Sequence, residues 1–150
     1  MNKLSITLIV STLCAISLNA QTRHVQWTYE SKEISKGLYE ISITAVPDFG
    51  WHIYDTLKTD FGPTATSVNF DESSGAETVG NLEIDGKLHK YYDDAFMMEV
   101  GYFEGNVTFR QKVRIPAGDD SVKAEVEWMS CNNTNCDRPA SQTIDIKVGK

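Results

Sequence analysis

The stretch NVTFRQKVRI, residues 106–115, alternates apolar and polar side chains along most of its length. One face of an extended chain here would carry Val107, Phe109, Gln111, Val113 and Ile115. Because successive side chains of a β-strand point to opposite faces of its sheet, this alternation predicts a strand with one face in a core and the other in water. Such half-buried strands are typical of antiparallel sheets.

Three other stretches repeat this two-residue period, at residues 38–45, 121–128 and 143–148. Weaker strand candidates, separated by turns rich in glycine, proline and aspartate, lie at residues 24–30, 51–55, 66–70, 77–84 and 97–103. No segment has the period of an amphipathic helix. About eight or nine short strands over this length predict one all-β domain, an immunoglobulin-like β-sandwich, with a closed β-barrel as the alternative.

The first twenty residues have the pattern of a signal peptide. Lys3 precedes the apolar stretch 4–18, and Leu18-Asn19-Ala20 ends in a small residue suited to cleavage after Ala20. We therefore expect a periplasmic or otherwise exported protein whose mature domain is residues 21–150. The apolar stretch is shorter than the ~20 residues that a membrane-spanning helix needs, so we expect no stable membrane insertion. The formal net charge of −7 argues against nucleic acid as a partner.

Cys131 and Cys136 are the two cysteines that the mature chain keeps, because Cys14 lies in the predicted signal peptide. In an oxidising compartment such a pair is usually bonded to itself. The four residues between them, Asn132-Asn133-Thr134-Asn135, are turn formers, so we expect the pair to close a loop at the end of a sheet.

Two interpretations of this disulfide stay open: a structural bond that fixes the loop, and a site of thiol–disulfide exchange. The loop-entropy relation assigns a ring of this size only about 2 kcal/mol, near the low end for disulfides. A bond that stabilises so little can open and close without unfolding the domain, as exchange requires. Asp137 follows Cys136 directly, and no histidine stands beside the pair in the sequence. We therefore expect thiols that are activated only on docking to a partner.

Metal binding is the weakest interpretation of the cysteines. Zinc in a structural site takes four ligands, and besides the cysteines the chain offers only His24, His52 and His89, at no paired spacing. We expect neither a metal nor a cofactor, and we expect the three histidines to have no special role.

Several pieces of the chain, taken in order, resemble the N-terminal periplasmic domain of the DsbD-type thiol:disulfide interchange proteins, the disulfide bond corrector domain family. The resemblance covers roughly residues 25–148. It is carried by Gly50-Trp51-His52-Ile53-Tyr54, Tyr91-Tyr92-Asp93-Asp94-Ala95-Phe96, Met98-Glu99-Val100 and Cys131 to Cys136 with the following Pro139. It implies an immunoglobulin-like sandwich and protein-disulfide reductase or interchange activity.

The resemblance also implies roles for single residues. Cys136 would exchange with partner thiols and Cys131 would resolve the mixed disulfide. Asp93, Asp94 and Phe96 would form a cap, with Phe96 lying over the disulfide. The wall of the site would include Tyr92, Tyr54 and Trp51, although ordinary core packing remains an alternative for every one of these aromatic residues.

Two departures from the family pattern qualify these roles. The cysteines enclose four residues where better-known members have five, and the cap segment is offset by about one residue. The chain also ends at Lys150, whereas full-length family proteins continue into a membrane domain and a thioredoxin-like domain. We therefore expect a relay that depends on a separate membrane electron donor and serves thioredoxin-like or disulfide-isomerase-like partners. The alternative is a non-catalytic immunoglobulin-like binding module with a structural disulfide.

Overall fold

The structure is a computed structural model, and it describes residues 24–149. The predicted signal peptide, residues 1–20, lies outside this range. The described residues form eleven strands and one short 3₁₀ turn, η1 (Glu72–Ser74). The strands are β1 (Val25–Ser35), β2 (Leu38–Pro47), β3 (His52–Tyr54), β4 (Ser67–Phe70), β5 (Glu77–Asp85), β6 (Leu88–Asp93), β7 (Met98–Glu104), β8 (Val107–Arg114), β9 (Ser121–Trp128), β10 (Ser130–Cys131) and β11 (Ala140–Lys147). Within residues 24–149, no helix is long and apolar enough to cross a membrane.

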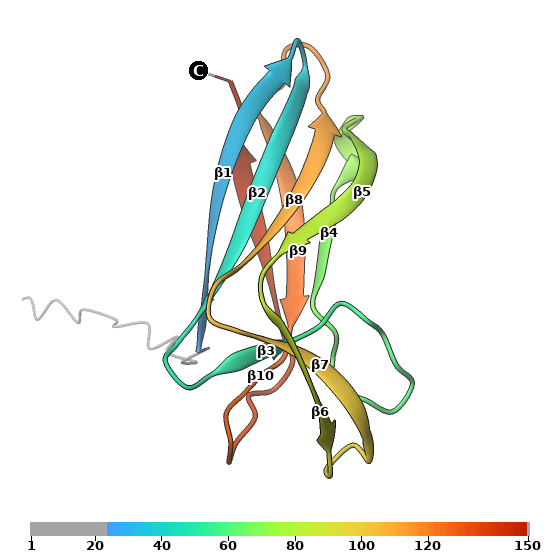
Figure 1. The fold of residues 1–150 in the computed structure, drawn as a ribbon. Helices are drawn as coiled ribbons and strands as arrows, with labels where there is room; N and C mark the ends of the chain where they lie inside the picture. The colour runs from blue at the N-terminus through green and yellow to red at the C-terminus, as the bar shows by residue number, and fades with distance from the viewer. Residues whose placement is uncertain (1–23, 150) are drawn as a thin grey trace, which may run out of the picture.

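Two of the three sheets form a sandwich along the long axis of the molecule (Figure 1). One has the strand order β1-β2-β8-β5 and the other β11-β9-β4, with antiparallel pairing throughout. The predicted all-β immunoglobulin-like sandwich is therefore confirmed, whereas the closed barrel is wrong because the sheets remain separate. The third sheet, β10-β3-β7-β6, lies at one end of the sandwich; we call it the end sheet.

The core lies between the two large sheets and follows the predicted alternation. In β8, Val107, Phe109 and Val113 are buried while their neighbours face outward. Gln111 also points inward, as predicted, and its side-chain amide donates a hydrogen bond of 3.0 Å to the carbonyl of Val79. That carbonyl lies where the pairing of β5 with β8 becomes irregular, and the bond gives the buried Gln111 amide a hydrogen-bond partner.

Two strands were not predicted from the sequence, β6 and β10, so the expected number of strands is too low. Strand β6 is mostly exposed and lies at an edge of the end sheet, so its residues lack a regular apolar period. Strand β10 has only two residues. The strand predicted at 143–148 begins earlier, at Ala140, because pairing with β9 extends to Trp128.

The end sheet is joined to the sandwich by strands that cross from one to the other. Strand β5 passes into β6 through Gly86, and β7 passes into β8 through Gly105. A Cβ atom at Gly86 would lie 2.6 Å from the Cγ2 atom of Val107, so the close crossing requires glycine. Ile53 and Phe103, from β3 and β7, join the large core cluster and anchor the end sheet on it.

Candidate functional site

The end sheet has two different faces. Ile53 of β3 pairs with Phe103 of β7, and both side chains belong to the sandwich core. Their neighbours must point the other way, because side chains alternate along a strand. His52 and Tyr54 therefore lie on the outer face, where Tyr54 pairs with Tyr102 and His52 pairs with Cys131.

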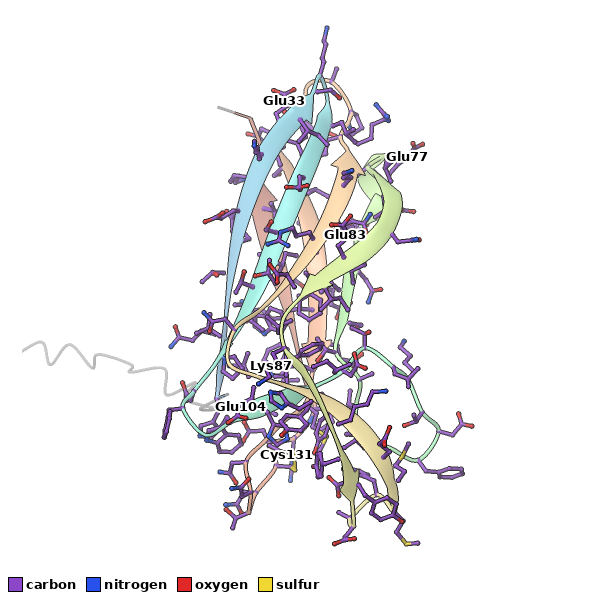
Figure 2. All side chains as sticks on the ribbon, in the orientation of Figure 1. Glu33, Glu77, Glu83, Lys87, Glu104 and Cys131 are labelled. Atoms are coloured by element: carbon purple, nitrogen blue, oxygen red, sulfur yellow. A yellow bond between two sulfur atoms is a disulfide. The ribbon has the colours of Figure 1, made fainter. Side chains whose placement is uncertain are left out.

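This outer face lines a cleft of about 660 Å³. Its walls include Trp51, His52, Tyr54, Phe96, Cys131 and Cys136. Figure 2 shows Cys131 and Glu104 at this end of the molecule and Glu33 and Glu77 toward the opposite end. Residues from three separate stretches of sequence thus meet around the two sulfur atoms.

Cys131 and Cys136 form a disulfide, with their Cα atoms 4.0 Å apart. The loop between them is held by Asn132, whose side-chain oxygen accepts hydrogen bonds from the backbone amides of Thr134 at 2.8 Å and Asn135 at 2.7 Å. Asparagine side chains commonly close turns in this way. The prediction that the pair closes a loop at a sheet end is confirmed.

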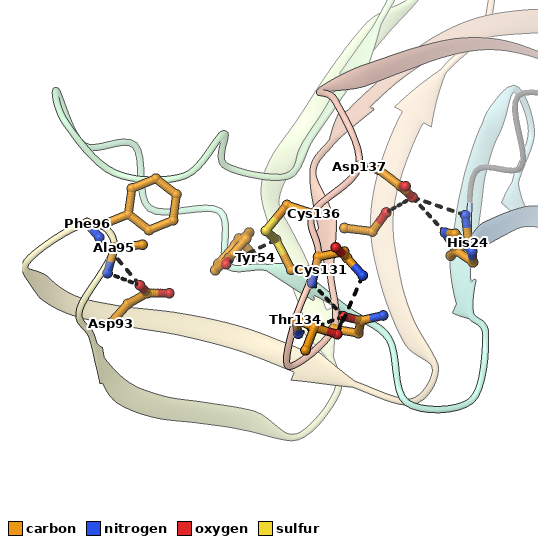
Figure 3. The surroundings of a disulfide bond; sticks show 12 residues. His24, Tyr54, Asp93, Ala95, Phe96, Cys131, Thr134, Cys136 and Asp137 are labelled. Carbon is orange, nitrogen blue, oxygen red and sulfur yellow. Dashed lines mark hydrogen bonds and ion pairs between the residues drawn. A yellow bond between two sulfur atoms is a disulfide. The ribbon is translucent and has the colours of Figure 1, made fainter.

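The two cysteines are unequally exposed. Cys131 is 1% exposed and packs in a small cluster with Tyr54 and Val100, whereas Cys136 is exposed. The Tyr54 hydroxyl donates a hydrogen bond of 3.3 Å to the Sγ atom of Cys131 (Figure 3). Burial raises the pKa of Tyr54, which keeps this hydroxyl protonated and able to donate. One cysteine is thus enclosed, with its sulfur hydrogen-bonded to Tyr54, while the other cysteine is exposed to solvent.

The predicted cap is the turn that joins β6 to β7. The Asp93 carboxylate accepts hydrogen bonds from the backbone amides of Ala95 at 2.8 Å and Phe96 at 3.4 Å, and from the hydroxyl of Tyr91 at 2.5 Å. Burial and this hydrogen bond to Asp93 raise the pKa of Tyr91. Asp94 is exposed in the turn. Asp93 therefore organises the turn from within.

Phe96 is half-buried and meets Tyr54 edge-on, with ring centroids 6.2 Å apart. Figure 3 shows its ring beyond Tyr54 as seen from the disulfide. Phe96 thus lines the same cleft as the disulfide, and its ring contacts Tyr54, whose hydroxyl is bonded to Cys131.

The predicted wall residues separate into two groups. Tyr54 and Trp51 line the cleft, and Trp51 also stacks on His24 with ring centroids 3.5 Å apart. Tyr92 is 63% exposed and pairs with Glu99, one step out of phase with the cleft-facing Tyr91, so the structure does not bring it to the cleft. Because side chains alternate along β6, Tyr91 faces the cleft and Tyr92 faces away from it. This orientation could be predicted only if residues 88–93 were already known to form a strand.

Two histidines that sequence reasoning dismissed lie close to the cysteine pair. His52 is paired with Cys131 in the sheet, and His24 bonds Asp137, the residue after Cys136. No histidine is a sequence neighbour of the cysteines, but folding brings these two to their surroundings from distant positions. Burial lowers the pKa of His52, although the charges of Glu104 and Asp93 oppose this shift. The two-residue spacing of His52 and Tyr54 was the signal that placed both on one face.

Comparison with known proteins identifies a matching protein family. The family model described as the N-terminal region of thiol:disulfide interchange protein DsbD matches residues 21–147. A search of curated protein sequences finds no match.

Three solved structures share the fold at low sequence identity. The N-terminal periplasmic domain of ScsB from Proteus mirabilis has a TM-score of 0.63 at 15% identity, covering 86% of this chain and 48% of that one. The reduced DsbD N-terminal domain of Neisseria meningitidis has a TM-score of 0.53 at 12% identity, covering 73% and 78%. The GAE domain of yeast GGA1 has a TM-score of 0.52 at 12% identity, covering 85% and 95%. This chain thus spans about half the length of the ScsB chain that it matches.

Proposed function

Because this chain belongs to the family of N-terminal domains of thiol:disulfide interchange protein DsbD, we propose that its Cys131–Cys136 pair passes electrons between a reductant and partner disulfides. The observation that carries the proposal is the unequal exposure of the two cysteines. Exchange requires one sulfur that a partner can reach and a second that is held in place to complete the reaction. The exposed Cys136 fits the first role and the enclosed Cys131 the second.

The reaction has two displacement steps. The thiolate of reduced Cys136 attacks one sulfur of the partner disulfide, and the other partner sulfur leaves as a thiolate that takes up a proton. The thiolate of Cys131 then attacks Cys136, which expels the second partner sulfur and forms the Cys131–Cys136 disulfide. Two electrons pass to the partner, and a separate dithiol reductant restores the pair by the reverse sequence.

The surroundings support this division of roles. The hydroxyl of Tyr54, 3.3 Å from Cys131, would stabilise negative charge on that sulfur when it becomes a thiolate. We assign Asp93, Asp94 and Phe96 to a cap: Asp93 holds the turn, Asp94 lies in its exposed part, and Phe96 covers the Tyr54 side of the cleft. Movement of this turn on docking would widen access to the disulfide.

A protein partner is favoured by the apolar side chains at this end. The most exposed large apolar residues of the described chain lie in the loops and edge strand around the end sheet: Phe49, Leu57, Phe61, Tyr92 and Met97. Exposed apolar side chains near a reactive site are suited to contact a protein partner. We propose that thioredoxin-like or disulfide-isomerase-like proteins dock here, in the periplasm, and that a membrane protein supplies the electrons.

Covalent trapping tests the proposal. The Cys131→Ala variant retains the attacking sulfur and loses the resolving one, so its mixed disulfides with partners should accumulate on non-reducing gels. The Cys136→Ala variant should form none. If neither variant differs from the wild-type protein when incubated with an oxidised thioredoxin-like protein, the exchange function is wrong.

The reduction potential of the pair separates this function from the alternative binding module. Structural disulfides of secreted proteins have potentials below about −300 mV, whereas exchange proteins lie roughly between −120 and −270 mV. Equilibration with glutathione or dithiothreitol, followed by alkylation of the free thiols, gives the value. A potential in the structural range would assign the disulfide to loop stability.

A further inference from the structure

A second polar cluster lies on the opposite side of the disulfide from Tyr54 (Figure 3). Its centre is the carboxylate of Asp137, the residue that follows Cys136. One oxygen of this carboxylate accepts a hydrogen bond of 2.9 Å from the His24 ring and one of 2.8 Å from the Ser130 hydroxyl. The backbone amide of His24 points at the same oxygen, at 3.4 Å.

His24 is itself fixed by contacts to another loop. Its ring stacks on Trp51 with an interplanar angle of 5°, and its carbonyl accepts a hydrogen bond of 2.8 Å from the amide of Asp48. The amide of Trp51 in turn donates to the carbonyl of Asp48. His24, the residue before β1, thus contacts both the loop between β2 and β3 and the residue after Cys136.

The charge of Asp137 matters for chemistry at Cys136. A carboxylate close to a thiol disfavours the thiolate, which is the attacking form. Burial opposes ionisation of Asp137, but the hydrogen bonds from His24 and Ser130 outweigh it, so the pKa of Asp137 lies below its ordinary value. Of the other charged or titratable side chains around the disulfide, Asp48 and Arg138 are exposed to solvent and therefore screened. His52, Asp93 and Glu104 line the cleft and are not among the hydrogen-bond partners of Asp137, which are His24 and Ser130. The hydrogen bonds to Asp137 are the groups placed to offset its charge.

We propose that His24 is a positioning residue for exchange at Cys136: it holds the Asp137 carboxylate away from the sulfur and offsets its charge, so that the Cys136 thiolate forms more readily. Figure 3 shows the carboxylate pointing toward His24 and away from the disulfide. This inference rests on the proposed function, because it concerns the nucleophile of that reaction. His24 acts on Cys136 through Asp137.

Two substitutions separate the hydrogen bond from the stacking contact. His24→Phe keeps an aromatic ring on Trp51 and loses the bond to Asp137, whereas His24→Gln keeps an N–H donor and loses the stack. Both are made in the Cys131→Ala background, where Cys136 is the one thiol of the mature chain. The pH dependence of its alkylation by iodoacetamide then gives its pKa without any partner.

We expect His24→Phe to raise the pKa of Cys136 by about half a unit to one unit, which lowers the thiolate fraction at neutral pH roughly threefold to tenfold. His24→Gln should stay close to the parent. Asp137→Asn should lower the pKa, and in that background His24→Phe should have no further effect. An unchanged pKa in His24→Phe, or the same shift with Asp137→Asn present, overturns the inference.

A measurement with both side chains intact covers the case in which a variant does not fold. In the Cys131→Ala protein, the NMR signals of the His24 ring should shift as the Cys136 thiol ionises. Signals that do not respond to this ionisation contradict the inference. Failure of the exchange function would instead appear as the absence of mixed disulfides, whatever the pKa of Cys136.

Discussion

The sandwich and the end sheet use the same backbone pattern for different purposes. In the sandwich, the inward apolar side chains of β2, β8 and β9 belong to one cluster, with Ile43, Phe109 and Val126 at most 1% exposed. In the end sheet, the outer face has only a small buried cluster, Tyr54, Val100 and Cys131, surrounded by half-buried aromatic and methionine side chains. The disulfide thus lies in the part of the domain that buries little apolar surface.

This separation has an energetic consequence. Local opening costs little where strands are short and few apolar contacts are lost. Strand β3 has three residues and β10 has two, whereas β2 and β8 have ten and eight. The end sheet can therefore rearrange around a reacting sulfur while the sandwich holds Ile53 and Phe103 in place. The predictions below test this division.

Replacement of a core residue should have the largest effect on stability. Phe109→Ala removes a buried ring from the centre of β8 and should lower the free energy of unfolding by about 3–5 kcal/mol, measured by urea denaturation. Phe49→Ala makes the same chemical change at a fully exposed ring and should have no measurable effect. Similar losses in the two variants would contradict the assignment of stability to the sandwich.

Reduction of the disulfide should cost less. The Cys131–Cys136 bond lowers the entropy of the unfolded chain and thereby adds only about 2 kcal/mol to the free energy of unfolding. The reduced protein should therefore remain folded, with a modestly lower urea midpoint. Far-UV circular dichroism with and without a phosphine reductant measures this. Unfolding of the whole domain on reduction would show that the disulfide is structural, and the exchange function would fall with it.

Replacement of Phe96, the residue proposed to form the cap, should change reactivity with little change in stability. Phe96→Ala removes the ring that covers Tyr54 and should speed reduction of the disulfide by a small thiol several-fold. Phe61→Ala removes an exposed ring from the neighbouring loop and should leave this rate unchanged, although it should slow exchange with a protein partner. Equal rates for the wild-type protein and Phe96→Ala would remove Phe96 from the cap.

The sandwich was more predictable from the sequence than the end sheet, for a physical reason. The strands of the large sheets carry a two-residue period because one face is buried and the other is in water, and residues 106–115 and 121–128 were located closely in this way. The edge strand β6 has no such contrast between its faces. The partners of Asp137 and Cys131, His24 and His52, are distant in sequence and meet them only through folding. A motif read along the chain cannot reveal contacts of this kind.

The smallest effect should come from His52, and its direction follows from its pKa. Burial lowers the pKa of His52 in the folded protein below the ordinary value of 6.5. As the pH falls below 6.5, the unfolded chain therefore gains a proton that the folded protein does not bind, so the free energy of unfolding decreases until the folded pKa is also passed. His52→Phe should remove this part of the acid sensitivity. Urea denaturation of both proteins at pH 7.5 and 5.5 measures it: the wild-type protein should lose more stability between the two values than His52→Phe. Equal losses would mean that the pKa of His52 is the same in the folded protein and in the unfolded chain. The outer face of the end sheet would then be more open to solvent than the buried Nε2 atom of His52, which has no hydrogen-bond partner, indicates.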